Sequence, residues 1–317
     1  MNDSLFNEIQ DSAKYLNLDL NSQEMAQFAM EHDLGEKQLQ ALSSVLSYLQ
    51  EKKKENIIST LLKLSRLPLK EPKTFENFDF TQLRGKQADI LKTLPTLSAL
   101  YAHKNLAFIG PQGVGKTHLA MAYGRECCRN GMKAYFLKAT ELNQKLTDAR
   151  KYGRESSTIN GLVKPSCLII DEVGRCVFDK ENTRMFFDII DRRYNKEGPN
   201  TMIFTSNKSL NTWGEFFNED SSLLCAMDRI FDMATVFMIR GNSYRGKQCE
   251  TIALSAGGQS DGDEEHPLCA DWRRRRIDAG QRKADDFPLP PADGAEQPQC
   301  RLHGAVWGFA GVPDRRY

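Results

Sequence analysis

Long apolar runs are missing from this sequence. None approaches the roughly 18 residues that a membrane-spanning helix needs, and the N-terminus lacks the apolar core of a signal peptide. The eight cysteines include no C-x-x-C pair, which speaks against a zinc site and a disulfide framework. Neither sign of charge is in large excess, since the formal net charge is +1, so any contact with nucleic acid requires a local basic patch. These absences predict a cytoplasmic protein with reduced cysteines and no membrane association.

Glycine and proline are almost absent from residues 1–66, where Gly35 is the single example of either. Such a composition predicts an N-terminal helical region with a break at Gly35. A small bundle with an apolar face is one interpretation of this region, and a docking face for a partner protein is the other.

Residues 67–104 are expected to form a linker and a lead-in to a larger domain. The boundary is marked by Pro68 and Pro72, because proline lacks a backbone donor and restricts the residue before it. Three aromatic side chains of the lead-in are expected to pack against the domain that follows: Phe75, Phe78 and Phe80.

Strand-like and helix-like runs alternate through residues 105–246. The five expected strands are 105–109, 134–137, 166–170, 201–205 and 234–239. Alternation of this kind predicts an α/β domain with parallel strands joined by crossover helices. Residues 247–317 differ, with frequent Pro, Gly and Ala and no sustained periodicity. They are expected to be a disordered tail, or alternatively a foreign read-through, frameshift or fusion segment.

A phosphate-binding loop follows the first expected strand. The run from Gly110 to Thr117 fits the pattern G-x-x-x-x-G-K-[ST], in which backbone N–H groups cradle phosphates at the start of a helix. Lys116 is expected to reach the outer phosphates of ATP, and the Thr117 hydroxyl to bind Mg²⁺. The predicted nucleotide-binding residues are Gly110, Pro111, Gln112, Gly113, Val114, Gly115, Lys116, Thr117 and His118.

Five further residues are candidates for a part in catalysis. Asp171 and Glu172 follow the third expected strand, so Asp171 is predicted to hold Mg²⁺ and Glu172 to act as the general base. Asn207, after the fourth strand, is placed to hydrogen-bond the γ-phosphate or the attacking water. Arg229 is a candidate to stabilise charge at a neighbouring subunit's site, with Arg245 as a weaker one. Each candidate has an alternative interpretation. Asp171 and Glu172 would be solvated acids at a strand end, and Asn207 would be part of an ordinary turn. Arg229 would form a surface ion pair with Asp228.

Together these residues resemble the AAA+ ATPases, and within them the IstB-type helper ATPases of insertion sequences, over about residues 66–247. The narrower resemblance is carried by Ser65-Arg-Leu-Pro, Leu168-Ile-Ile-Asp-Glu-Val-Gly, Arg192-Arg-Tyr, Thr205-Ser-Asn, Trp213-Gly-Glu-Phe-Phe, Asp228-Arg-Ile and Gly241-Asn-Ser-Tyr-Arg245. The resemblance implies a five-stranded parallel sheet in the order 5-1-4-3-2 and ATP-dependent assembly into a homo-oligomer on DNA. It also implies a transposase as partner. The related DnaC-type loaders of the replicative helicase provide the alternative function, and a stand-alone metabolic kinase is a third.

A basic segment after the second strand is the expected contact surface for double-stranded DNA. It contains Lys145, Arg150, Lys151 and Arg154, with Gly153, Ser156 and Ser157 nearby. A flexible loop is expected there, and its binding should be largely independent of DNA sequence, because it offers phosphate contacts only. The alternative is an ordinary solvated loop.

Overall fold

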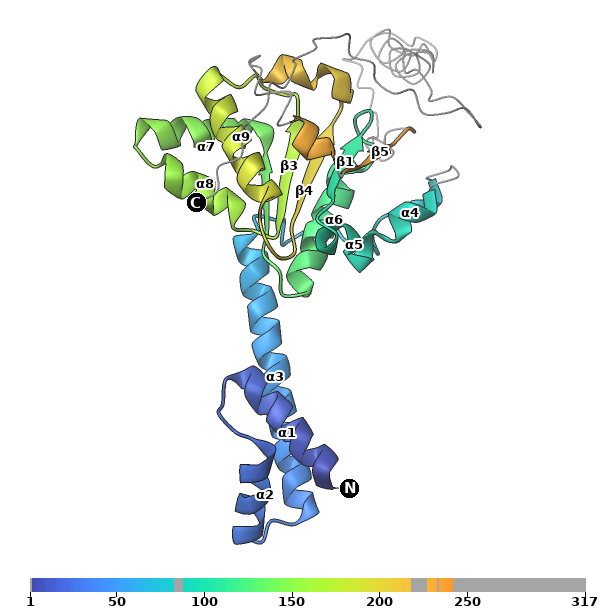
Figure 1. The fold of residues 1–317 in the computed structure, drawn as a ribbon. Coiled ribbons are helices and arrows are strands. Elements are labelled where there is room, and N and C mark those ends of the chain that lie inside the picture. The colour runs from blue at the N-terminus through green and yellow to red at the C-terminus, as the bar shows by residue number, and fades with distance from the viewer. Residues whose placement is uncertain (1, 83–87, 218–226, 233, 242–317) are drawn as a thin grey trace, which may run out of the picture. The chain divides into compact units, whose positions relative to one another are not determined.

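The computed structural model describes residues 2–82, 88–217, 227–232 and 234–241 (Figure 1). The tail from residue 247 onward and Arg245 lie outside the described residues, as does a helix that the sequence predicts to begin at Ser221 or Ser222. No helix in the described ranges is both long enough and apolar enough to cross a membrane.

Three helices occupy the N-terminal region: α1 (Asn2–Leu16), α2 (Ser22–Glu31) and α3 (Glu36–Leu64). The side chain of Asn21 caps α2 by accepting a hydrogen bond from the backbone N–H of Glu24 at 2.8 Å. Gly35 immediately precedes α3, at the expected break. The helices bury a shared apolar cluster that consists of Ile9, Met25, Ala29, Leu39 and Leu46.

The central sheet has five parallel strands in the order β2-β3-β4-β1-β5, which confirms the order expected from the sequence. The strands are β1 (Asn105–Ile109), β2 (Ala134–Lys138), β3 (Cys167–Val173), β4 (Thr201–Ser206) and β5 (Ala234–Met238). β4 therefore lies between β1 and β3, although it comes after both in the chain. Because all strands run parallel, their carboxyl ends lie at one edge of the sheet.

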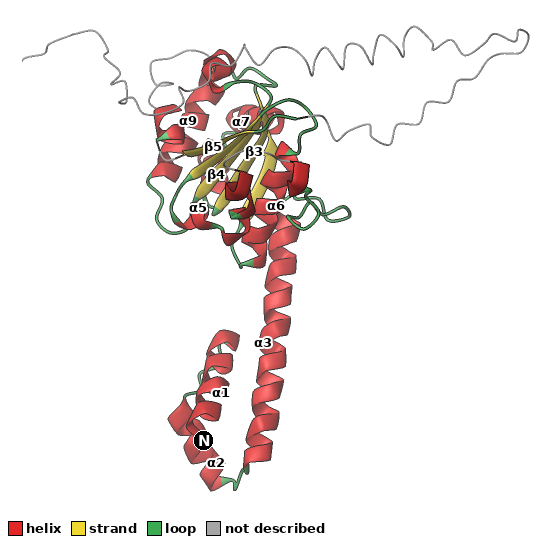
Figure 2. Ribbon diagram, turned by 90° about the vertical axis from the view of Figure 1, so that its right-hand side faces the viewer, coloured by secondary structure: helices red, strands yellow, loops and turns green. Residues whose placement is uncertain are grey.

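Helices cover both faces of this sheet (Figures 1 and 2). The covering helices are α6 (Lys116–Arg129), α7 (Ala139–Lys151), α8 (Glu155–Val163) and α9 (Lys180–Tyr194). Alternate residues of β1 enter different cores: Leu106 and Phe108 pack with α6, whereas Ala107 and Ile109 pack in the cluster that contains residues of α7, α8 and α9. Burial on both faces explains why β1 is a continuous apolar run.

The lead-in segment packs in the α6 core. It forms the short helices η1 (Phe80–Gln82), α4 (Ala88–Lys92), η2 (Leu94–Thr96) and α5 (Ser98–Tyr101). Phe75 and Phe78 are buried there and Phe80 packs against them, as expected. Cys127, Cys128 and Cys167 are free thiols in the same core.

The structure corrects two expectations about the elements. The third strand extends beyond residue 170 and includes both Asp171 and Glu172, whereas the apolar run predicted that it ends before them. The basic segment after β2 is a helical hairpin rather than a flexible loop, because α8 begins at Glu155 and contains Ser156 and Ser157. Only residues 152–154 separate α7 from α8.

Candidate nucleotide-binding site

The loop between β1 and α6 has the backbone that a phosphate cradle requires. Gly110 has φ 155° and Gly115 has φ 95°, conformations that residues with a side chain rarely adopt. Space is also restricted, since a Cβ on Gly110 would lie 2.0 Å from the Ile239 carbonyl oxygen. A Cβ on Gly115 would lie 2.6 Å from Cε2 of Phe78. Both glycines are therefore required by geometry, and the loop opens directly into the N-terminus of α6.

Lys116 supplies the positive charge of the loop. Its side chain is largely buried, and its Nζ donates a hydrogen bond to the carbonyl oxygen of Pro111 at 2.6 Å. The ammonium group is thus held over the loop that begins at Gly110, where the outer phosphates of a nucleotide would lie. A buried cation beside the N-terminus of a helix is a strong anion site.

Asp171 and Thr117 are brought together at the end of β3. The Thr117 hydroxyl donates to Oδ1 of Asp171 at 2.7 Å, and the Asp171 carboxylate is almost fully buried. The Thr117 hydroxyl and the Asp171 carboxylate are two potential oxygen ligands beside a phosphate loop. This set fits Mg²⁺, which binds one or two protein oxygens together with phosphate and water oxygens. Within the described residues, no group of three or more His, Cys, Asp or Glu side chains forms a self-sufficient metal site.

Glu172 has an unusual backbone and a restrained carboxylate. Its φ is 59°, in the left-handed region that a non-glycine residue seldom enters. Its Oε1 accepts a hydrogen bond from Arg175 at 2.6 Å, and Lys138 at the end of β2 lies 3.7 Å from Oε2. Oε2 makes no hydrogen bond to the described residues, so a general base at this position has one oxygen held by Arg175 and one without a hydrogen-bond partner.

Asn207 and Arg229 lie in different surroundings. Asn207 is exposed and follows β4 directly, and the adjoining Ser206 carbonyl accepts a hydrogen bond from the Gly110 N–H at 3.1 Å. The structure thus brings Asn207 to the start of the phosphate loop. Arg229 pairs with Asp191 of α9 at 3.2 Å, not with Asp228 as the alternative interpretation expected. Both side chains of this pair are nearly half exposed.

The ring of His118 contacts the lead-in segment. Its Nε2 lies 2.7 Å from the carbonyl oxygen of Thr74 and therefore donates to it, and the ring packs against Phe78. Burial lowers the pKa of His118 and so favours the neutral ring, in which the tautomer with a proton on Nε2 makes this contact. The side chain thus holds the lead-in segment against α6.

The basic segment presents two cations around one exposed aromatic ring. Lys151 and Arg154 lie on the ring of Tyr152, at 5.4 Å and 6.0 Å from its centroid. Arg150, in contrast, forms an ion pair with Asp179 at 2.5 Å. Lys151 and Arg154 are therefore the members of the predicted DNA surface that flank the exposed Tyr152.

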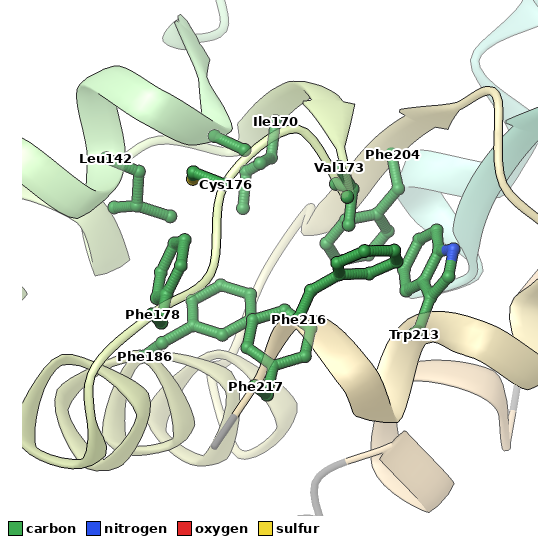
Figure 3. Close-up of a pocket in the computed structure, with 12 residues that line it drawn as sticks. Leu142, Ile170, Val173, Cys176, Phe178, Phe186, Phe204, Trp213, Phe216 and Phe217 are labelled. Carbon is green, nitrogen blue, oxygen red and sulfur yellow. The ribbon is translucent and has the colours of Figure 1, made fainter.

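An aromatic cluster supports the strand ends next to the site (Figure 3). Trp213 packs edge-on against Phe204 of β4, with ring centroids 5.7 Å apart, and Phe216 lies against Gly174, two residues after Glu172. The lining is almost entirely apolar, so this pocket is part of the core and holds the ends of β3 and β4 in place. The resemblance singled out Trp213-Gly-Glu-Phe-Phe, and packing now explains the Trp and both Phe residues.

Sequence reasoning missed three residues that touch the two acids. Arg175 and Lys138 contact the Glu172 carboxylate, and Thr205 contacts both Asp171 and Glu172. Thr205 was visible in the sequence as part of Thr205-Ser-Asn, but nothing in that pattern indicated its partners.

Comparison with known proteins identifies similar sequences. The sequence model of the family described as "IstB-like ATP binding protein" matches residues 13–251. The insertion sequence IS5376 putative ATP-binding protein of Geobacillus stearothermophilus is 36% identical over 70% of this chain and 85% of its own length. The insertion sequence IS232 putative ATP-binding protein of Bacillus thuringiensis subsp. berliner is 31% identical over 76% and 95%. The crystal structure of the DnaC helicase loader matches 52% of this chain and 97% of its own, at 20% identity and a TM-score of 0.42.

Proposed function

Because this chain belongs to the family of IstB-like ATP-binding proteins, we propose that it hydrolyses ATP with Mg²⁺ as cofactor and thereby assists transposition of an insertion sequence. The observation that carries the proposal is the convergence of three groups at one edge of the sheet. These are the buried Lys116 ammonium, the Thr117 hydroxyl and the Asp171 carboxylate, the last two 2.7 Å apart.

Each residue has a defined part in the proposed reaction. The loop amides and Lys116 would bind the phosphates, and Thr117 and Asp171 would hold Mg²⁺, which would supply positive charge to the phosphates when bound. Glu172 accepts a proton from the water that attacks the γ-phosphorus, while Asn207 orients that water or the γ-phosphate. The bond between the γ-phosphorus and the β–γ bridging oxygen then breaks, and the products are ADP and phosphate.

Assembly is the second part of the proposal. Arg229 is exposed and lies in the helical residues 227–231 just before β5, so its guanidinium is accessible to another copy of the chain. We propose that an ATP-dependent homo-oligomer places Arg229 of one subunit beside the γ-phosphate bound by the next. A contribution from a neighbouring subunit would couple hydrolysis to assembly.

The proposed partners are double-stranded DNA and the transposase of the same element. Support comes from the relatives, whose names place them in insertion sequences, and from the cations around Tyr152. Loading of a replicative helicase is the alternative, in which the N-terminal region would bind the helicase and duplex DNA would not be bound. A neighbouring transposase gene with terminal inverted repeats would favour transposition.

The test is a comparison of ATP binding and hydrolysis. Lys116→Ala should abolish useful ATP binding because the outer phosphates lose their cation, and Glu172→Gln should bind ATP but hydrolyse it far more slowly, because an amide is no base. Lys180→Ala, at an exposed position at the start of α9, is the control and should match the wild type. Equal ATP affinity in Lys116→Ala and the wild type would refute the assignment.

A further inference from the structure

One hydroxyl group on β4 contacts both acids of the site. Thr205 is buried, and its Oγ1 donates a hydrogen bond to Oδ1 of Asp171 at 2.5 Å. The same oxygen accepts a hydrogen bond from the backbone N–H of Glu172 at 3.0 Å. A hydroxyl has one proton and two lone pairs, so these two contacts are compatible and directional.

The contact occurs where the pairing of β3 and β4 is irregular. Ile170 pairs with Phe204, but the next pair is Val173 with Ser206, so the register shifts between them. Asp171 and Glu172 therefore both lie opposite Thr205, which is the arrangement of a β-bulge. A bulge removes a backbone N–H from the ladder, and the Thr205 hydroxyl supplies the acceptor that the Glu172 amide would otherwise lack.

The same hydroxyl supports a strained backbone. Glu172 has φ 59°, and a non-glycine residue remains in this region only when its surroundings hold it there. The amide contact to Thr205 fixes the backbone from one side, and Ser206 Oγ donates to the Val173 carbonyl at 2.7 Å on the other. The bulge thus determines the orientation of the Glu172 side chain, while the Asp171 carboxylate remains hydrogen-bonded to Thr117.

We propose that Thr205 is a positioning residue that sets the Mg²⁺-binding carboxylate of Asp171 and the backbone of Glu172 relative to each other. This inference rests on the proposed ATPase function. Loss of the hydroxyl should free the Asp171 carboxylate to rotate and should leave the Glu172 amide without its acceptor, so both Mg²⁺ affinity and hydrolysis depend on it. In this role Thr205 acts through Asp171 and Glu172.

The decisive variants in the full-length protein are Thr205→Val, which keeps the shape of the side chain, and Thr205→Ser, which keeps the hydroxyl. Thr205→Val should lower kcat for ATP hydrolysis roughly tenfold to a hundredfold, the loss expected for a hydrogen bond to a charged group. It should also raise the Mg²⁺ concentration needed for half-maximal tightening of ATP binding. ATP affinity measured in EDTA should be unchanged, and Thr205→Ser should restore most of the rate and the Mg²⁺ dependence.

The matched control lies on the same strand. Thr201 is equally buried, and its hydroxyl donates to the Lys104 carbonyl at 2.7 Å, at the opposite end of β4 from the acids. Thr201→Val should lower the melting temperature comparably but leave the Mg²⁺ dependence as in the wild type. The inference is overturned if Thr205→Val shows wild-type Mg²⁺ dependence, if Thr205→Ser does not rescue it, or if Thr201→Val shows the same defect. Because Mg²⁺-dependent ATP binding is measured separately, these outcomes are decided even if the wild type proves not to hydrolyse ATP.

Discussion

Arg193 on α9 shows how one side chain can connect several segments of the ATPase domain. Its guanidinium is almost fully buried, and burial lowers its pKa to about 10, so it remains charged at neutral pH. It donates hydrogen bonds to backbone carbonyls at 2.8–3.4 Å, which belong to Leu162, Val163, Pro165, Ser166 and Thr201. These carbonyls lie at the end of α8, before β3 and at the start of β4. The guanidinium therefore satisfies backbone carbonyls between the end of α8 and the start of β3 with side-chain hydrogen bonds.

Substitution of this arginine should strongly destabilise the domain. Arg193→Met fills similar space but leaves several buried carbonyls unpaired, at roughly 1–3 kcal/mol for each group that finds no water. We expect a loss of at least about 3 kcal/mol in the free energy of unfolding, or roughly 6–12 °C in melting temperature. The control is Arg192→Met, which removes an exposed ion pair with Asp188 and should change stability by less than about 1 kcal/mol. Similar melting temperatures for the two variants would contradict this role.

The helical hairpin of α7 and α8 provides a rigid support for the proposed DNA contact. Gly153, with φ 62°, allows the sharp turn, and the Arg150 ion pair with Asp179 joins α7 to the start of α9. Tyr152 is 60% exposed between Lys151 and Arg154. The cations are thus presented from a short turn between two helices, whereas the sequence predicted a flexible loop. A fixed pair of charges loses less side-chain entropy on binding a phosphate than a mobile loop would.

Replacing these two cations should weaken DNA binding in a salt-dependent way. Each phosphate contact contributes about 0.9 to the slope of log affinity against log salt, so Lys151→Ala with Arg154→Ala should make that slope shallower by up to about 1.8. Duplex binding by the full chain should be measured with and without ATP across a salt series, because several aligned subunits multiply weak contacts. The control is Arg184→Ala with Arg192→Ala, which removes two exposed arginines of α9. An unchanged slope would place the DNA surface elsewhere, and no binding at any salt would favour the helicase-loader alternative.

The strand order explains how one site forms from distant parts of the chain. β1 and β3 both flank β4, so the phosphate loop after β1, the acids of β3 and Asn207 after β4 meet at one sheet edge. Arg229 does not join them, since it pairs with Asp191 on α9. In our proposal, the residues of one chain bind and activate the nucleotide, and a neighbouring copy provides the cation that stabilises charge in the transition state.

Mixing two inactive variants tests this division of labour. Arg229→Ala should keep ATP binding but lose turnover by roughly 10³–10⁵-fold if Arg229 acts as a full arginine finger. Mixed with Glu172→Gln, it should recover part of the activity, because some interfaces then combine an intact Glu172 with an intact Arg229. Asp191→Ala, which frees Arg229 from its intrachain partner, is the control and should retain turnover. Absence of rescue, together with wild-type activity that does not depend on protein concentration, would indicate an intramolecular role.

The sequence alone determined the five parallel strands, their order through the family resemblance, the phosphate loop and the pair of acids. These features depend on residues close together in the chain: a glycine pattern at fixed spacing, an apolar run, and an acid directly after it. Only the tertiary structure decided which side chains meet across the fold. The contacts of Thr205 with Asp171 and Glu172, of His118 with Thr74, and of Arg193 with its carbonyls join residues distant in the chain. They follow from strand register, one bulge and helix packing, and a shift of a single residue in any of these would give different partners to the same sequence.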